Sequence, residues 1–257
     1  MKFVRFSIEG NAQVYNGVMD GTCIRTYNGN PFESIELTQE QYPLDAVSLH
    51  SPVLPRTIIG IGKNFIAEGT PKPPIPELPI FFFKPLTTVI GPNDPILFPA
   101  HVTEAKFEAE VAVIIGKTAK NITPDQVSQY IFGCTIANDL AATQYFHHEG
   151  HWTVGKAFDT FCPLGPYIDT EFDYLNARIS ARLNGQQLQN DTMEHIITPI
   201  PEMISYISSF MTLMPGDVIL TGTPAGSDFI RVGDVIECIV DGLGVLRNPV
   251  NKSEATT

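Results

Sequence analysis

Two glutamates in an apolar segment are the first residues in the chain that suggest chemistry. The segment KFEAEVAVIIG (106–116) is predicted to form a strand, and it carries Glu108 and Glu110 two positions apart. Side chains of a strand alternate between its faces, so both carboxylates point the same way. Two like charges on a half-buried face repel each other unless a cation lies between them, and an all-oxygen site suits Mg²⁺, Mn²⁺ or Ca²⁺. We interpret the pair as half of a metal site; a solvent-facing edge strand with two unengaged glutamates is the alternative.

Composition and charge narrow the class of protein. The chain has 257 residues and a formal net charge of −12, and no basic cluster offsets this acidity. An acidic surface of this kind argues against nucleic acid and anionic membranes as partners. The N-terminal segment MKFVRFSIEG lacks an apolar core of signal-peptide length, and no run approaches the length of a membrane span. These features predict a cytoplasmic protein with no membrane partner.

The four cysteines are predicted to be free thiols. They lie far apart, each in or beside an apolar run, and no CxxC spacing is present. This distribution is typical of buried thiols and not of a disulfide framework or a zinc site.

Turn residues and periodicity divide the chain into three parts. Residues 1–54 read as short strands and turns, with a hairpin at Met19-Asp20-Gly21, and end in the proline-bounded link SPVLPR. We predict a small N-terminal β-domain at 1–54, a main domain at 55–250 and a frayed tail at 251–257.

The main domain is predicted to be rich in strands. It opens with the buried strand TIIGIGKNF, whose Gly60 and Gly62 allow something to approach the backbone closely, and continues into a proline-rich loop at 70–79 that is long enough for a lid. Thr123 and Pro124 predict a helix that runs to about Gly133. Asn184-Gly185 predicts a hairpin turn, and apolar residues recur at helical spacing from Pro199 to Leu213. The fold class is therefore α+β, predominantly β.

Several separated segments together resemble the fumarylacetoacetate hydrolase family. The segments KFEAEVAVIIG, ANDLAA, GKAFDTFCPLGP, LNGQQLQ, MTLMPGDVILTGTPAG and GDVIECIVDGLG occur in the family's order and spacing, between roughly Pro55 and Val250. The resemblance implies a mixed β-sandwich or β-roll with a few peripheral helices, and a homodimer. It also implies a Mg²⁺ or Mn²⁺ ion held by Glu108, Glu110 and Asp139.

The same resemblance assigns roles to residues around the metal. Lys156 corresponds to a family lysine that points into the site, where it holds an anionic substrate or relays a proton once its pKa is depressed. The loop Thr221-Gly222-Thr223-Pro224 corresponds to the family's substrate-binding loop, with Gly222 and Thr223 as its ligands. Lys84 corresponds to a lysine–proline step at the pocket, and Phe65 lies in the segment that carries the family's base.

The chain departs from the family pattern where the catalytic base is expected. The segment Asn64 to Glu68 lacks the family's histidine, and Pro71 stands where a glutamate is expected. Glu68 is a candidate replacement base, although a lone glutamate near a turn is more often a surface residue. After the metal aspartate, Thr143 and Phe146 replace the family's arginine and glutamine. The histidines His147, His148 and His151 follow, and His148 is a candidate substrate ligand or base.

These residues predict a metal-dependent enzyme that acts on a small 2-oxo acid or its enol. A 2-oxo acid chelates the cation, so charge that develops on enolisation or C–C cleavage is stabilised. Without the hydrolytic histidine, isomerisation, tautomerisation or decarboxylation is favoured over acylpyruvate-type hydrolysis. The alternatives are a catalytically silent protein that binds metal and oxo acid, and a purely structural metal protein.

Overall fold

A large mixed sheet is the framework of the fold. The computed structural model describes residues 1–11, 13–66 and 69–253. In it, strands are paired in the order β4-β3-β2-β1-β13-β12-β11-β16-β6-β7, with β5 added beside β1 and β8 beside β13. The strands of this sheet are β1 (Lys2–Ile8), β2 (Val14–Asp20), β3 (Cys23–Asn30), β4 (Ser34–Pro43), β5 (Val47–His50), β6 (Ile58–Ile61), β7 (Phe81–Lys84), β8 (Val89–Ile90), β11 (Ala109–Ile115), β12 (Ile131–Asn138), β13 (Cys162–Asp169) and β16 (Val218–Leu220).

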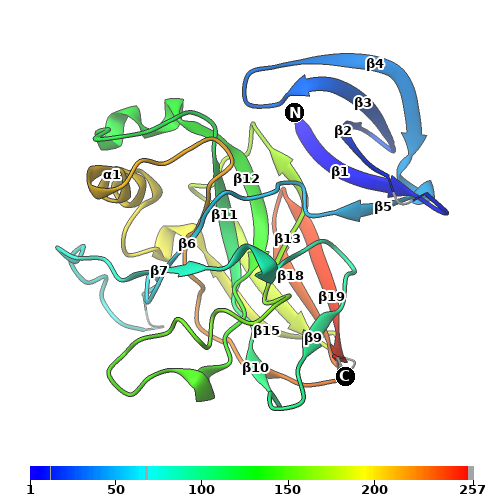
Figure 1. Ribbon diagram of the computed structural model, residues 1–257. Coiled ribbons are helices and arrows are strands. Elements are labelled where there is room, and N and C mark those ends of the chain that lie inside the picture. Colours follow the sequence, from blue (N-terminus) through cyan, green and yellow to red (C-terminus); the bar gives the residue numbers. More distant parts are fainter. Residues whose placement is uncertain (12, 67–68, 254–257) are drawn as a thin grey trace.

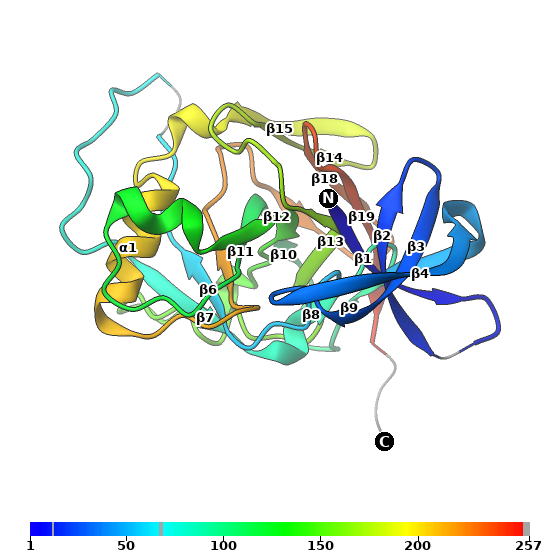
Figure 2. The same cartoon turned by 90° about the horizontal axis from the view of Figure 1, so that it is seen from above.

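The N-terminal strands continue this sheet. The hairpin expected at Met19-Asp20-Gly21 joins β2 to β3, with Asp20 paired to Cys23. Strand β1 then pairs antiparallel with β13, and Phe3 lies opposite Ile168. Figures 1 and 2 show the N-terminal strands and helix α1 (Ile200–Phe210) at opposite ends of the molecule. The N-terminal part is therefore joined to the rest by backbone pairing as well as by the chain.

A second sheet covers the central strands of the first and encloses the core. Its order is β15-β14-β18-β19-β9, and β10 and β17 form a separate pair. Contacts between β11 and both β14 and β18 show that the two sheets lie face to face. The core cluster joins many aliphatic side chains with several buried phenylalanines, and the side chain of Ile136 within it is 0% exposed. The strands are β9 (Ile96–Phe98), β10 (Ala105–Lys106), β14 (Arg178–Leu183), β15 (Gln186–Thr192), β17 (Phe229–Ile230), β18 (Val235–Val240) and β19 (Gly244–Lys252).

Helices are few and peripheral, as the predominantly β prediction requires. The helix predicted between Pro199 and Leu213 is confirmed as α1, which buries Ile200, Met203 and Ile207 on one face. The helix predicted from Thr123 to Gly133 is wrong in type and length. The capping box of Thr123 and Gln126 is present, but it heads only a 3₁₀ helix, Pro124–Gln129. The apolar residues that follow form β12 instead, because pairing with β11 and β13 satisfies their backbone and buries their side chains.

The remaining short elements and the C-terminus complete the description. Other 3₁₀ helices are Leu44–Ala46, Leu86–Thr88, Thr143–Tyr145 and Met193–His195. Strand β19 extends to Lys252 and pairs with β9, so fraying does not begin at Asn251 as expected; residues 254–257 lie outside the described part. All four cysteines are free thiols, as predicted. Among the described residues, no helix is long and apolar enough to cross a membrane.

Replacing Ile136 by alanine tests whether the space between the sheets is the main core. The cavity left between β12 and the covering sheet should lower the free energy of unfolding by about 2–5 kcal/mol, measured by urea denaturation. Leu37→Ala on β4, where the side chain is 41% exposed, should change it by less than about 0.5 kcal/mol. Equal losses in the two variants would contradict this assignment of the core.

Candidate metal centre and active site

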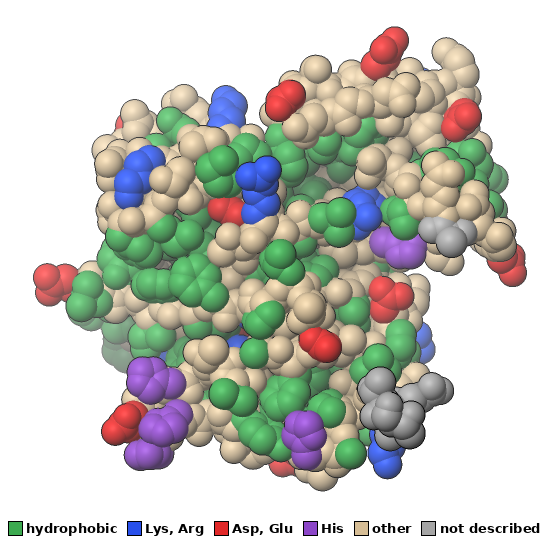
Figure 3. All heavy atoms as spheres, viewed as in Figure 1, with side chains coloured by type: hydrophobic (Ala, Val, Ile, Leu, Met, Phe, Trp, Pro, Cys, Tyr) green, Lys and Arg blue, Asp and Glu red, His purple; other side chains and the backbone are tan. Residues whose placement is uncertain are grey.

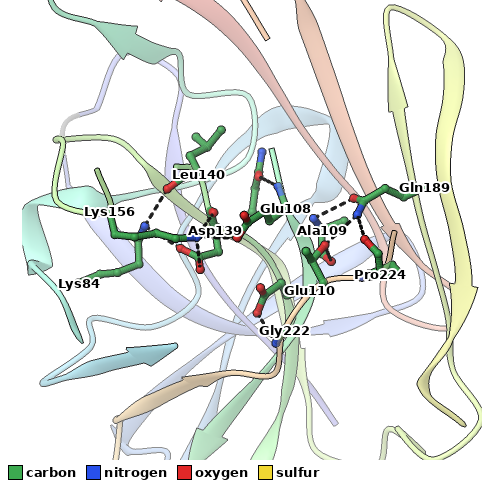
Figure 4. Close-up of polar contacts among 12 residues, drawn as sticks. Lys84, Glu108, Ala109, Glu110, Asp139, Leu140, Lys156, Gln189, Gly222 and Pro224 are labelled. Carbon is green, nitrogen blue, oxygen red and sulfur yellow. Dashed lines mark hydrogen bonds and ion pairs between the residues drawn. The ribbon is translucent and has the colours of Figure 1, made fainter. Parts of the chain in front are cut away.

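Three carboxylates converge at one end of the large sheet. Glu108 lies just before β11, Glu110 lies within it, and Asp139 directly follows β12. Because the two strands are antiparallel, with Ala109 opposite Asn138, the start of one meets the end of the other. Ligand oxygens of the three acids all lie within 4.8 Å of one another. Figure 4 shows Lys84 and Lys156 next to Asp139, with Glu108 and Glu110 toward the centre of the view. The structure thus brings together the three residues that the sequence assigned to a metal.

Backbone contacts fix the relative position of these acids. The amide of Asp139 donates to the carbonyl of Glu108 at 2.9 Å, and the amide of Glu108 donates to Oδ1 of Asn138 at 3.0 Å. The carboxylates cannot separate without breaking these bonds. The site is therefore held in place by the same pairing that builds the sheet.

Two lysines form ion pairs with Asp139, and one of them, Lys156, also bridges to Glu108. Nζ of Lys84 lies 2.7 Å from Oδ1 of Asp139, and Nζ of Lys156 lies 2.8 Å from Oδ2 and 2.5 Å from Oε2 of Glu108. Burial raises the pKa of Asp139, but the two ammonium groups outweigh it and hold that pKa below its usual value. Burial lowers the pKa of Lys156, but Asp139 and Glu108 outweigh it and raise that pKa. The depressed pKa expected for Lys156 is thus wrong in this arrangement, because two carboxylates surround the ammonium group.

Glu110 is the acid that most needs a further cation. Its side chain is 2% exposed, and Oε2 accepts a hydrogen bond of 2.7 Å from the amide of Gly222. Burial, together with the charges of Asp139 and Glu108, raises its pKa well above the usual value. Within the described residues, no lysine or arginine forms an ion pair with it. A hard divalent cation bound by Glu108, Glu110 and Asp139 would supply the missing charge, and the all-oxygen donor set fits Mg²⁺ or Mn²⁺.

The loop after β16 packs against the strand that carries the glutamates. The hydroxyl of Thr221 donates to the carbonyl of Val111 at 2.9 Å, and that of Thr223 donates to the carbonyl of Ala109 at 2.8 Å. The side-chain amide of Gln189 donates to Oγ1 of Thr223 at 2.8 Å and to the carbonyl of Pro224 at 2.7 Å. The groups expected to bind substrate therefore also hold the loop in place. Gln189 was not singled out from the sequence, although its segment LNGQQLQ was.

A cavity of about 410 Å³ opens above the carboxylates. Seven of the predicted site residues line it, namely Phe65, Glu108, Glu110, Asp139, Lys156, Gly222 and Thr223. Lys84 lies behind them and acts on the site through Asp139. Glu68 is outside the described residues, so its role as a base stays a prediction. Substrate contact by the lining residues also stays a prediction.

The histidines do not reach this cavity. The rings of His147 and His148 lie 4.2 Å apart and both side chains are exposed. Figure 3 shows histidine side chains gathered at one corner of the surface, beside an acidic residue. The structure thus does not bring His148 to the site where the sequence placed it.

The proline-rich segment lies beside a different hollow. Pro73, Pro76 and Leu78 line a depression of about 300 Å³, together with Asn64 and Thr198. Asn64 is buried there and binds the backbone of Thr198 and Thr221, so it links the segment after β6 to the loop after β16. Closure of the segment over the carboxylates stays a prediction.

Comparison with known proteins identifies the family. The family model for the fumarylacetoacetate (FAA) hydrolase C-terminal domain matches residues 57–251. The chain belongs to the fumarylacetoacetate hydrolase family. A second model, Rv2993c-like N-terminal, matches residues 1–52.

Named relatives of this family member carry different activities. The solved structure of a 5-carboxymethyl-2-hydroxymuconate delta-isomerase from Mycobacterium smegmatis superimposes with a TM-score of 0.90 at 35% identity, covering 98% of this chain and 100% of that one. Oxaloacetate tautomerase fahd2, mitochondrial, from Xenopus laevis is 38% identical over 79% of this chain and 68% of its own length. A maleylpyruvate hydrolase from Sphingobium, solved with manganese(II) and pyruvate, gives a TM-score of 0.83 at 27% identity, with coverage of 99% and 100%. Isomerase, tautomerase and hydrolase are thus all represented among its relatives.

Replacing Glu110 by glutamine tests the metal centre. The amide keeps the shape of the side chain and an oxygen that can accept from Gly222, but it removes one charged ligand. We expect Mg²⁺ and Mn²⁺ affinity, measured by calorimetry, to fall at least about tenfold. Glu40→Gln on the exposed strand β4 is the matched control and should bind as the wild type does. Unchanged affinity in the Glu110 variant would defeat the assignment of the three ligands.

The raised pKa of Glu110 predicts how the metal-free protein responds to pH. Its carboxyl binds a proton more tightly when folded than when unfolded, so stability falls as the pH rises from 4.5 through the raised pKa. With chelator present, the free energy of unfolding of Glu110→Gln should therefore increase relative to wild type between about pH 4.5 and pH 8. Urea denaturation at each pH measures this difference, and added Mg²⁺ should stabilise the wild type. A difference independent of pH would contradict the prediction.

Proposed function

We propose that this chain is a Mg²⁺- or Mn²⁺-dependent enzyme that acts on a small 2-oxo acid or its enol. The observation that supports this most strongly is the meeting of Glu108, Glu110 and Asp139 with Lys156 beside a cavity of small-molecule size. A structural metal site would not need a lysine and an open cavity next to its ligands. The arrangement therefore favours catalysis over a purely structural role.

The balance of charge suits an anionic substrate. Three carboxylates and the two ammonium groups of Lys84 and Lys156 leave one net negative charge, which a bound divalent cation would convert to one net positive charge. A 2-oxo acid brings a carboxylate and a carbonyl oxygen that can chelate the same ion. When bound, the metal supplies a Lewis acid that stabilises negative charge on the 2-oxo oxygen.

The protein's own residues would orient the ligands and hold protons. Lys156 keeps its proton and fixes Glu108 and Asp139, because its Nζ donates to Oε2 of Glu108 and to both the carbonyl oxygen and Oδ2 of Asp139. These contacts use all three of its N–H groups, so its role here is to orient the two carboxylates. The amide of Gly222 keeps Glu110 turned inward. The proton at the carbon next to the 2-oxo group needs a separate base, for which Glu68 is the candidate.

Tautomerisation or isomerisation is the reaction class that we favour. The described residues lining the cavity include no histidine that could activate water for C–C hydrolysis. Moving a proton between carbon and oxygen requires no activated water, and decarboxylation does not require it either. Relatives named as an oxaloacetate tautomerase and a delta-isomerase support this preference. A cytoplasmic location and a homodimer are further parts of the proposal that rest on the sequence.

The first experiment follows enol loss and pyruvate release on oxaloacetate, acylpyruvates and unsaturated 2-oxo dicarboxylates. We expect activity with Mg²⁺ or Mn²⁺ that chelator abolishes. Lys156→Met should lower kcat at least about 100-fold, because it removes the charge that orients two metal ligands. Glu68→Gln should lower kcat by a similar factor if this residue is the base.

The results of these assays distinguish a metal-dependent enzyme from a catalytically silent binding protein. Metal-independent activity would contradict the proposal. Mg²⁺-dependent binding of oxalate or pyruvate without turnover of any compound would replace it by the catalytically silent binding protein.

A further inference from the structure

An aromatic wall forms one side of the candidate active-site cavity. The side chains of Phe82 on β7, Phe146 and Trp152 all line it. The ring of Phe82 meets that of Trp152 edge-on at 5.7 Å between centroids, and Trp152 stacks on Phe146 at 5.8 Å with an interplanar angle of 22°. The three rings therefore form a continuous apolar surface, here called the aromatic wall.

Three glycines make room for this wall, one for each ring. A Cβ added to Gly60 would lie 2.3 Å from Cζ of Phe82, and one added to Gly62 would lie 2.2 Å from Cζ3 of Trp152. A Cβ on Gly155 would lie 2.5 Å from Cδ1 of Phe146. None of the three has a positive φ, so the backbone conformation does not require glycine there. The space taken by the rings is the physical reason for the glycines, and it shows that the rings are built into the cavity.

The wall begins next to the polar end of the cavity. Nζ of Lys156 lies 5.0 Å from the centroid of the Phe82 ring, and the same atom contacts the carboxylates of Glu108 and Asp139. A substrate whose oxygen-bearing head lies at these carboxylates would extend its remaining part along the rings. The rings thus lie where the variable part of a 2-oxo acid would be.

We propose that the aromatic wall determines specificity, and that it selects 2-oxo acids with a planar, uncharged tail over those that end in a second carboxylate. This inference rests on the proposed function and specifies its substrate class. Conjugated or aromatic tails stack well on ring faces, whereas a carboxylate placed against them loses water and meets the negative side of the rings. Two other cations line the cavity, the exposed Lys63 and the half-buried Lys106, but neither belongs to the wall.

The test compares phenylpyruvate with oxaloacetate, whose tautomerisation can be followed by ultraviolet absorbance with Mg²⁺ present. We expect kcat/KM for phenylpyruvate to exceed that for oxaloacetate at least about tenfold. Phe146→Gln and Gly62→Ala should each reduce this ratio about tenfold, the first by removing a ring and the second by displacing Trp152.

Phe83→Ala is the matched control. It lies next to Phe82 on β7, is 45% exposed and does not line the cavity, so the ratio should stay at the wild-type value. Oxalate, which has a chelating head and no tail, should bind all variants with wild-type affinity in calorimetry. This shows that a changed ratio does not come from a damaged metal site.

A higher kcat/KM for oxaloacetate than for phenylpyruvate would overturn the inference. It would indicate instead that Lys106 binds the second carboxylate of the substrate. A ratio unchanged in both Phe146→Gln and Gly62→Ala would also overturn it. If neither compound turns over, the same ratio is measured from Kd values with Mg²⁺, so the wall is tested apart from catalysis. Failure of the proposed function has a different signature, which is the absence of both turnover and Mg²⁺-dependent oxalate binding.

Discussion

The placement of three carboxylates, two of them buried, within 4.8 Å of one another is the constraint on which the rest of the site depends. Such a cluster repels itself and loses the stabilisation that water would give it. Two buried lysines, Lys84 and Lys156, compensate part of this negative charge through Asp139, and the backbone amide of Gly222 donates a hydrogen bond to Glu110. The two lysines hold the pKa of Asp139 below its usual value, whereas burial raises the pKa of Glu108 and raises that of Glu110 well above the usual value. The unbalanced charge at Glu110 is the feature that fits this site for a small divalent cation.

Sheet topology explains how distant residues meet at this cluster. Strands β12 and β16 both run antiparallel to β11 and flank it, so both end where β11 begins. Asp139 follows one neighbour and the loop from Thr221 to Pro224 follows the other. The two glutamates at the start of β11 therefore lie between an acid and a donor loop. The register of three strands thus places the candidate ligands with no need for a long mobile loop.

Local patterns in the sequence predicted part of this arrangement, and the resemblance to the family supplied Asp139, Lys156 and the loop after β16. The Glu108–Glu110 spacing, the hairpin turns and the periodicity of α1 depend on neighbouring residues, so they can be read directly. The short length of the 3₁₀ helix at Pro124 could not be predicted in this way, because pairing of β12 with distant strands overrides the helix signal. The raised pKa of Lys156 likewise depends on distant residues, because its carboxylate partners Asp139 and Glu108 lie 17 and 48 positions away in the sequence. Gln189 contacts Thr223, which is 34 positions away. Gly60 and Gly62 signalled a close approach, but only the structure shows that Phe82 and Trp152 make it.

The sequence divides the chain into an N-terminal part, residues 1–54, and a main domain, but strand β1 of the first pairs with strand β13 of the second. The two parts therefore share one hydrogen-bonded sheet. Strand β13 has β12 on one side and receives β1 at Ile168 and Asp169 on the other. A chain without its first fifty residues would present this row of backbone amides and carbonyls to solvent, and exposed strand edges recruit other strands. The N-terminal strands therefore cover an edge of the sheet that carries the candidate metal ligands, which gives a physical reason for the two units to be kept in one polypeptide.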